Sequence, residues 1–365
     1  MSSHRLAGRP KDGQSCAPGS LYIHKERTDV RFVQFTQRQM KVCVFGAGAI
    51  GGHLAGRLAK GGAEVSIIAR GAHLAAIQAH GLRVETPSEV MEAHVPASDD
   101  PAALGPQDAV IVAVKAPALS SVAASIAPLL DPDTSVIFVM NGIPWWYWQK
   151  HGGPQNGRAL PLLDPGGALA RAVEPRRVMG GVVYSACTVT APGIVRVEST
   201  GGKLVLGELD GVVSPRAEAM AAPLRAGGIT VEVSPRIRDA VWAKLLLNLG
   251  SGPLGALGAA APRDFYAEPA CREATRAVLA EAAALAAAMG CVVVPDVEGQ
   301  IRQGAGSGHK TSILQDLEAG RPMEIDALYT VPLQMARAAA VATPMLDLLV
   351  GLVRVRARAA GLYAG

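Results

Sequence analysis

A glycine-rich segment near the start of the chain has the residue types and spacing of a phosphate-binding turn. Glycines at its first, third and sixth positions would allow a tight turn, a close backbone approach to a pyrophosphate, and close packing of a helix on a strand. The helix that follows would direct free N–H groups and the positive end of its dipole at the phosphates. A turn without a ligand is the alternative, but this motif has its own strand before it and its own helix after it. The sequence therefore predicts a dinucleotide-binding turn made of Gly46, Ala47, Gly48, Ala49, Ile50 and Gly51.

The residue after the second predicted strand, residues 64–69, bears on the choice of dinucleotide. Sites for NAD usually have Asp or Glu there, about 20 residues past the glycines, where it binds the ribose hydroxyls. Here the strand is followed by Arg70 and Gly71. A carboxylate would repel a 2′-phosphate, whereas a guanidinium can bind it through two hydrogen bonds. Arg70 therefore favours NADP(H), the alternative being a solvated arginine at a strand end.

Polar residues also follow two further predicted strands. Lys115 comes after the strand at residues 109–114, and Asn141 comes after the strand at residues 135–140. Ligands of open α/β sheets bind outside the carboxyl ends of the strands. We therefore expect Arg70, Lys115 and Asn141 to point into one crevice.

The second half of the chain has charged and polar residues at helical spacing. Lys244 and Asn248 are four residues apart, on one face of a predicted helix. Ser312 and Glu324 lie near predicted helix starts, where acidic and hydroxyl side chains commonly stabilise the helix end. From spacing alone, Lys244 and Asn248 would belong to a solvent-exposed helix face, and Ser312 and Glu324 to ordinary helix starts. Spacing alone therefore indicates no catalytic role for them.

The positions of these residues depend on an alternation of strand and helix patterns between residues 41 and 197. Short β-branched segments bounded by Gly, Pro, Asp or Asn recur there, with Ala- and Leu-rich helical patterns between several of them. This alternation is typical of βαβ units and of a parallel sheet covered on both faces. The predicted strands are residues 42–45, 64–69, 109–114, 135–140 and 178–183, and two of the predicted helices are residues 49–60 and 118–127.

The pattern changes near residue 236, after which long apolar runs at helical spacing dominate. They cover residues 237–248, 269–289, 325–339 and 343–360. We therefore predict an α/β protein in which an N-terminal, nucleotide-binding, Rossmann-type domain with a parallel sheet is followed by an all-helical C-terminal domain for the substrate. The predicted ranges are 1–39 for a flexible extension, 40–235 for the nucleotide-binding domain and 236–365 for the helical domain.

Composition excludes several classes of protein. The chain has 365 residues, of which 49% are hydrophobic and 18% charged, so it is not disordered as a whole. Residues 1–40 hold seven Lys or Arg and three Asp or Glu, which accounts for the whole formal net charge of +4. The neutral remainder argues against nucleic-acid binding. Lack of a long apolar run argues against a membrane span. Five dispersed cysteines without a C-x-x-C pair indicate reduced thiols, no zinc site and a cytoplasmic location.

Several stretches together resemble the ketopantoate reductase family (2-dehydropantoate 2-reductases), in the same order along the chain from residue 40 to about residue 362. They are K-V-C-V-F-G-A-G-A-I-G-G at 41–52, V-K-A at 114–116, N-G at 141–142, W-A-K-L-L-L-N at 242–248 and K-T-S-I-L-Q-D-L-E-A-G-R-P-M-E-I-D at 310–326. The resemblance implies a Rossmann domain and a helical domain with a 2-oxo acid bound in the cleft between them. It also implies reduction of 2-dehydropantoate to pantoate in pantothenate biosynthesis, and a protein that often forms dimers.

The resemblance also implies roles for individual residues. Lys244 matches the catalytic lysine, which protonates the ketone oxygen, and burial would lower its pKa. Glu324 matches the glutamate that orients the substrate and meets the cofactor. It would hold the substrate's hydroxyl and counter the charge of Lys244. The remaining matches are Asn141, Asn248 and Ser312 at the substrate, and Lys115, Asn141 and Ala186 at the cofactor.

Two departures from the family pattern concern the substrate pocket. Gly252 stands where the family usually has a second asparagine, four residues after Asn248. The stretch from Trp145 to about residue 174 resembles an insertion, and it holds three of the four tryptophans, just after Asn141. Aromatic clusters more often serve packing. We nevertheless expect a pocket for a 2-oxo acid that is bulkier or less polar than ketopantoate.

Two other functions fit the same organisation. One is an opine or hydroxy-acid dehydrogenase, which usually relies on a His or Lys in different surroundings. None of the eight histidines has an evident carboxylate partner in the sequence, and His309 is the one nearest the expected site. The other is a sensor that binds NADP without catalysis, against which the presence of Lys244, Asn248, Ser312 and Glu324 together argues.

Overall fold

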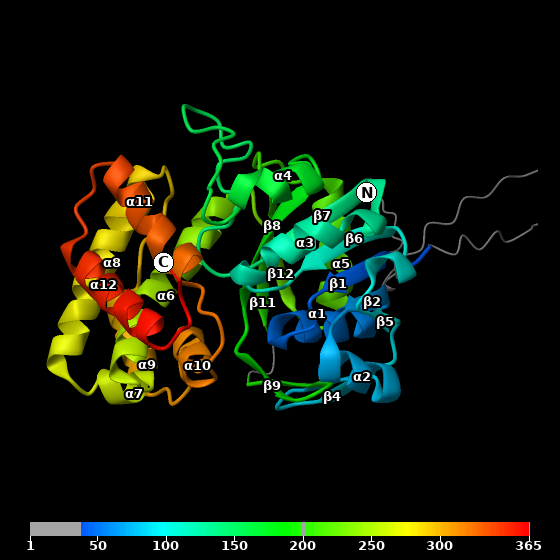
Figure 1. Cartoon of the computed structure of the whole chain (residues 1–365), viewed down its shortest axis with the longest axis horizontal. Coiled ribbons are helices and arrows are strands. Elements are labelled where there is room, and N and C mark those ends of the chain that lie inside the picture. The colour runs from blue at the N-terminus through cyan, green and yellow to red at the C-terminus, as the bar shows by residue number, and fades with distance from the viewer. Residues whose placement is uncertain (1–37, 199–201, 365) are drawn as a thin grey trace, which may run out of the picture. The chain divides into compact units, whose positions relative to one another are not determined.

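The computed structural model of the chain describes residues 38–198 and 202–364. The part before residue 236, called the first half here, is built on an eight-stranded sheet, and the part from residue 236 onwards is called the second half (Figure 1). The predicted extension at residues 1–39 lies almost wholly outside the described residues. The spatial order of strands is β12-β11-β8-β7-β6-β1-β2-β5. Their bounds are β1 Lys41–Phe45, β2 Glu64–Ile68, β5 Ala97–Ser98, β6 Gln107–Val112, β7 Leu130–Val139, β8 Val178–Tyr184, β11 Lys203–Glu208 and β12 Thr230–Val233.

Neighbouring strands of this sheet run parallel except for β8 and β11, which are antiparallel. The predicted parallel sheet is confirmed, because the five predicted strands are β1, β2, β6, β7 and β8. In β1, Val44 lies opposite Ile67 on one side and Ile111 on the other. Apolar runs in these central strands are buried on both faces, as expected for a covered parallel sheet.

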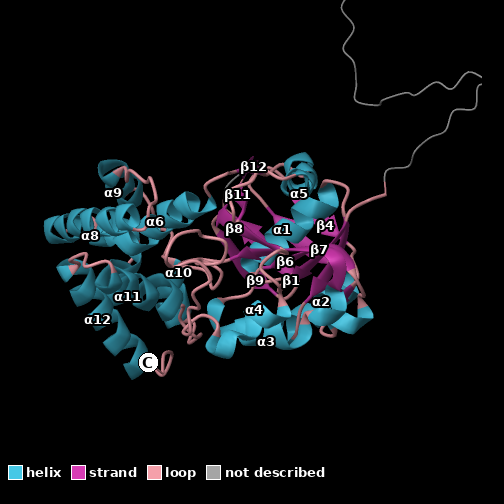
Figure 2. Cartoon of the chain, turned by 90° about the horizontal axis from the view of Figure 1, so that it is seen from above, coloured by secondary structure: helices cyan, strands magenta, loops and turns pink. Residues whose placement is uncertain are grey.

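Helices cover both faces of the sheet (Figure 2). Val42 and Val44 share a hydrophobic cluster with residues of α1 and α5, whereas Cys43 and Phe45 share another with α3 and α4. Since side chains alternate along a strand, the two pairs of helices lie on opposite faces. The helices of this half are α1 Ala49–Lys60, α2 Gly71–His80, α3 Leu119–Ser125, α4 Ala168–Ala172 and α5 Pro215–Ala226.

A second, four-stranded sheet, which the sequence did not predict, packs on the outer side of α1. Its order is β4-β3-β10-β9, with β3 Leu82–Glu85, β4 Val90–Ala93, β9 Cys187–Ala191 and β10 Ile194–Val197. Two glycines of α1 allow this contact. A Cβ atom at Gly52 would lie 2.7 Å from Val195, and one at Gly56 would lie 2.8 Å from Val84. The helix that begins at the glycine turn is therefore enclosed between two sheets.

The second half of the chain is helical, and no strand follows β12 among the described residues. Its central helix, α6, runs over Ile237–Gly258, ten residues beyond the predicted end at Asn248, and contains Pro253. No helix in the described ranges is long and apolar enough to cross a membrane. The other elements are α7 Pro262–Phe265, α8 Pro269–Ala288, α9 Val297–Ala305, α10 Ser312–Glu318, a π-helical turn Asp326–Thr330, α11 Val331–Ala338 and α12 Pro344–Ala359.

Candidate active site

The glycine turn between β1 and α1 has the geometry that phosphate binding requires. Gly46 has φ +99°, and a Cβ atom there would lie 2.6 Å from Val114. A Cβ atom at Gly51 would lie 1.9 Å from the carbonyl oxygen of Gly46, so only glycine lets the helix start this close to the turn. No described side chain caps α1 at Gly48, and a Cβ atom added at Gly48 would meet open space. The first N–H groups of α1 therefore fit an anionic group.

A small cavity of about 180 Å³ adjoins this turn. Arg70 lines it together with Gly46 and Gly48. His73, which the sequence analysis did not single out, also lines it, and its Nε2 lies 2.7 Å from the carbonyl oxygen of Ala47. The Nδ1 of the same ring accepts a hydrogen bond of 2.9 Å from the N–H of Gly193. His73 thus connects the glycine turn to the loop between β9 and β10 of the small sheet. These partners are far apart in the sequence, so no local pattern predicts the contact.

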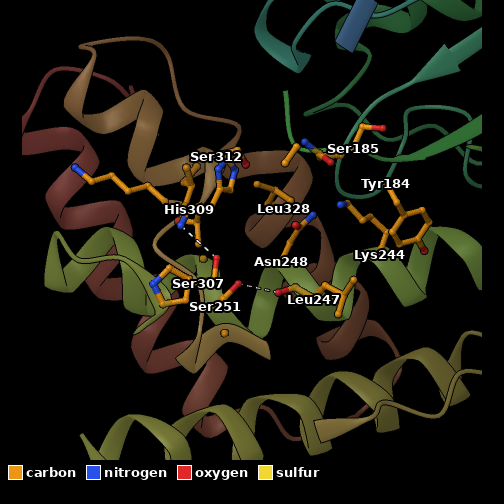
Figure 3. A pocket seen from close by; sticks show the side chains of 18 of the residues that line it. Tyr184, Ser185, Lys244, Leu247, Asn248, Ser251, Ser307, His309, Ser312 and Leu328 are labelled. Atoms are coloured by element: carbon orange, nitrogen blue, oxygen red, sulfur yellow. Dashed lines mark hydrogen bonds between the residues drawn. The ribbon is translucent and has the colours of Figure 1, made fainter. Parts of the chain in front are cut away.

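A larger cavity of about 470 Å³ lies where the sheet edge meets the helices (Figure 3). Six of the predicted site residues line it, three from each half of the chain. They are Ile50, Asn141 and Ala186 from the first half and Lys244, Asn248 and Ser312 from the second. Lys244 and Asn248 project from the same side of α6 (Figure 3). The spacing of four residues therefore gives the shared helix face that the sequence predicts.

Lys244 is the cationic group of this cavity that lies against the sheet. Its Nζ is 4.9 Å from the ring centroid of Tyr184, near enough for a cation–π contact. Burial lowers the pKa of Lys244 below its ordinary value of 10.5, as expected from the sequence. Within residues 38–198 and 202–364, no acidic side chain forms an ion pair with it.

Glu324 is buried close by, in a different hydrogen-bonding environment. Its Oε1 accepts a hydrogen bond of 3.1 Å from the N–H of Ala116, and its carboxylate is also hydrogen-bonded by Asn141. Burial raises the pKa of Glu324, while these hydrogen bonds and the charge of Lys115 oppose that rise. The expectation that Glu324 would counter the charge of Lys244 is wrong for this structure, because the carboxylate bonds to the sheet edge instead.

The three residues expected in one crevice are separated. Arg70 lines the small cavity, Asn141 lines the larger one, and Lys115 forms an ion pair with both carboxylate oxygens of Asp316 on α10. Asp316 is only 2% exposed and also accepts a hydrogen bond of 2.9 Å from Nε of Arg321. A buried carboxylate on a helix attracts the lysine away from the strand-end crevice. Asp316 lies 201 residues after Lys115 in the chain, beyond the reach of a local pattern.

Both observations that suggested a bulkier or less polar substrate have another explanation. Trp145 and Trp146 are each 1% exposed and belong to the hydrophobic core, where Trp145 packs edge-on against Phe138. The place beside Gly252 is filled, because a Cβ atom there would lie 2.5 Å from the hydroxyl oxygen of Tyr329. The tryptophans therefore serve packing, and the glycine accommodates a phenol.

His309 has the carboxylate partner that the sequence did not reveal. Its Nδ1 lies 3.0 Å from a carboxylate oxygen of Glu198, and its side chain lines the larger cavity. The expectation that no histidine has such a partner is therefore wrong, since Glu198 lies in the first half of the chain and His309 in the second. No cluster of three or more His, Cys, Asp or Glu residues in the described part of the chain could hold a metal ion.

Comparison with known proteins identifies relatives over most of the chain. Residues 42–145 match the family described as ketopantoate reductase PanE/ApbA, and residues 236–357 match its C-terminal part. A 2-dehydropantoate 2-reductase from Mesorhizobium japonicum is 42% identical over 327 residues, which is 89% of this chain and 100% of that protein.

Solved structures give the same result. A chain from Ralstonia solanacearum MolK2, assigned as a ketopantoate reductase, superimposes with a TM-score of 0.82 at 42% identity and covers 89% of this chain and 100% of its own. D-mandelate dehydrogenase, solved with NADH and anilino(oxo)acetate, has a TM-score of 0.73 at 22% identity over 89% of this chain and 100% of its own. At that identity the second likeness concerns the fold alone.

Proposed function

The chain belongs to the ketopantoate reductase family of oxidoreductases, and on that premise we propose that it uses NADPH to reduce 2-dehydropantoate, or a close 2-oxo acid analogue, to the 2-hydroxy acid. The observation that carries the proposal is the position of Lys244. Its amine lacks an ion-pair partner among the described residues, its side chain is half-buried, and it lines the cavity that Ile50 and Ala186 also line at the sheet edge. The family implies 2-dehydropantoate as the substrate and pantothenate biosynthesis as the pathway.

The nicotinamide dinucleotide fits the residues of the sheet edge. The N–H groups at the start of α1 would hold its pyrophosphate, and Arg70 would hold a 2′-phosphate next to the same turn. Ile50, Asn141 and Ala186 would line the nicotinamide side. When bound, the cofactor supplies the hydride that reduces the carbonyl carbon of the substrate.

The side chains of the larger cavity would provide the acid chemistry and the orientation. A ketone oxygen gains negative charge during reduction, and the ammonium of Lys244 would stabilise that charge and donate a proton to the oxygen. Asn248 and Ser312 would position the substrate from α6 and from the start of α10. Glu324 would act through Asn141, whose amide it holds, and through the backbone of Ala116.

A panel of 2-oxo acids tests this proposal most directly. NADPH or NADH is mixed with the protein and each acid in turn, and the loss of reduced-nicotinamide absorbance is followed. Reduction of 2-dehydropantoate or of a close analogue, faster with NADPH, is the expected result. If the protein binds NADPH but reduces none of the 2-oxo acids, the proposed function is contradicted. That result would favour the alternative of a sensor that binds NADP without catalysis.

One observation favours a second candidate, a hydroxy-acid dehydrogenase that relies on histidine. The pair formed by His309 and Glu198 lines the same cavity as Lys244 and has the carboxylate–imidazole arrangement of a general acid. Comparing Lys244→Ala with His309→Gln distinguishes the two, because the variant that loses turnover identifies the proton donor.

The remaining properties follow from the same premise. We propose a nucleotide-binding domain at residues 40–235 and a substrate domain at 236–365, since β12 ends at Val233 and α6 begins at Ile237. A cytoplasmic location is supported by the free thiols of Cys43, Cys187, Cys271 and Cys291. A homodimer is supported by an exposed apolar stripe on α12 made of Leu348, Leu352 and Val355.

A further inference from the structure

One face of α6 continues beyond Lys244 and Asn248 to two glycines, at 252 and 255. Residues at these intervals lie on the same side of a helix. At both glycines, a hydroxyl from another segment fills the place of a side chain. A Cβ atom at Gly252 would lie 2.5 Å from Oη of Tyr329, and one at Gly255 would lie 2.8 Å from Oγ1 of Thr311.

Polar atoms along this face are buried without hydrogen-bond partners in the described structure. They are Nδ2 of Asn248, Oη of Tyr329 and Oγ1 of Thr311, and all three residues line the larger cavity. A buried polar group without a partner costs free energy, so native structures seldom retain several together. Three such atoms in one cavity wall indicate a ligand that supplies the missing hydrogen bonds.

From this geometry we infer that Tyr329 is a specificity-determining residue whose hydroxyl binds an uncharged polar group on the tail of the 2-oxo acid. The inference rests on the proposed function, because it requires the ketone oxygen of the substrate to lie at Lys244. Each step of four residues along α6 advances about 6 Å. Gly252 is two such steps beyond Lys244, and the hydroxyl of Tyr329 lies beside Gly252. This hydroxyl would therefore face the end of the substrate that points away from the sheet.

The charges around the cavity favour an uncharged tail. Two other lining side chains that can be cationic are already engaged, His309 with Glu198 at 3.0 Å and Lys310 with Glu318 at 2.6 Å. Burial raises the pKa of Tyr329, and the charge of Glu324 raises it further, so the phenol stays neutral. A neutral hydroxyl both donates and accepts hydrogen bonds. It matches a hydroxyl on the substrate better than a second carboxylate.

The position of the Tyr329 hydroxyl also excludes a side chain at position 252. Any Cβ atom there would overlap the hydroxyl of Tyr329, so the glycine and the tyrosine form one unit. The polar atom that faces the substrate tail therefore comes from the π-helical turn Asp326–Thr330 and not from α6.

A substrate pair that differs by one hydroxyl tests the role of Tyr329. The acids are 2-dehydropantoate and 3,3-dimethyl-2-oxobutanoate, which lacks the terminal hydroxyl, and the variant is Tyr329→Phe. We expect kcat/KM to fall about tenfold for the hydroxylated acid and to change less than about twofold for the other. The matched control is Tyr266→Phe in the same cavity, whose hydroxyl already donates to the carbonyl of Gly250 at 3.4 Å. It is expected to leave the ratio of the two kcat/KM values within about twofold.

Calorimetry with the two corresponding 2-hydroxy acids provides a readout apart from turnover. Tyr329→Phe should weaken binding of the hydroxylated acid alone. Equal losses for both acids overturn the role of Tyr329 while leaving the proposed function intact. A wild-type protein that turns over both acids equally well also overturns it, even if the variant does not fold. Reduction of neither acid by the wild-type protein instead refutes the proposed function, and this inference with it.

Discussion

Asp316 on α10 forms an ion pair with Lys115, which lies three residues after the end of β6, so one carboxylate joins the helical half to the edge of the sheet. The carboxylate is 2% exposed, whereas the lysine side chain is 47% exposed. Lys115 contacts both oxygens of this carboxylate, and Nε of Arg321 also donates to one of them, Oδ1. The pair therefore holds Lys115 in place beside Ala116, whose N–H bonds to Glu324.

Removing this carboxylate should destabilise the protein. In Asp316→Asn the two cations lose their partner, and we expect the free energy of unfolding to fall by about 1–3 kcal/mol, less than for a fully buried pair because Lys115 is half exposed. Urea denaturation measures the change. Glu318→Gln, which breaks the exposed pair with Lys310, is the matched control and should cost less than about 1 kcal/mol. Equal losses in the free energy of unfolding for the two variants would show that the buried pair stabilises the protein no more than the exposed pair does.

Replacing Lys244 should remove turnover and keep cofactor binding. Lys244→Ala is expected to lower kcat by about 10²–10⁴-fold, because the proton donor and the positive charge at the ketone oxygen are both lost. NADPH binding, followed by its fluorescence, should persist, since the glycine turn is untouched. Lys203→Ala, at an exposed lysine paired with Glu232, is the control. Near-normal turnover in Lys244→Ala contradicts the role of proton donor.

The pH dependence of turnover should report the buried lysine. The donor must be protonated, so kcat/KM is expected to fall as the pH rises through the pKa of Lys244. Because burial lowers that pKa, the fall should occur below 10.5. In Lys244→Arg the guanidinium stays charged to a pKa of about 12 or more, so the residual activity should lose this alkaline limb. The same limb in both proteins would assign it to another group.

Arg70 should select the phosphorylated cofactor. Arg70→Ala is expected to raise KM for NADPH about tenfold and to change KM for NADH little, because only the former carries a 2′-phosphate. Steady-state kinetics with both nicotinamides gives the comparison. Arg83→Ala, at an arginine paired with Glu85 and Glu92 on the small sheet, is the control. A wild-type preference for NADH removes the reason for assigning this role to Arg70.

The features that could be predicted from the sequence are those that depend on residues near one another in the chain. The glycine turn was predictable because Gly46 and Gly51 occupy places where a side chain would clash. The central strands were predictable because they are apolar runs buried on both faces. The shared face of Lys244 and Asn248 follows directly from helical periodicity.

Contacts between distant segments could not be predicted in this way. The small sheet consists of short strands, and β4 alternates exposed and buried residues over four positions, too few for a clear signal. The pairs Lys115–Asp316 and His309–Glu198 join the two halves of the chain, so only the folded arrangement brings them together. The same holds for Tyr329 and Gly252. From the sequence of α6 alone, one would expect empty space beside Gly252, whereas the hydroxyl of Tyr329 fills it.

The enclosure of α1 between two sheets has a consequence for the energetics of cofactor recognition. A helix fixed on both sides loses little conformational entropy when an anion meets its first turn, so more of the interaction energy remains as affinity. A nucleotide that binds at this turn would therefore meet a surface that is already formed, and the glycines that admit the second sheet would contribute to affinity without touching the ligand.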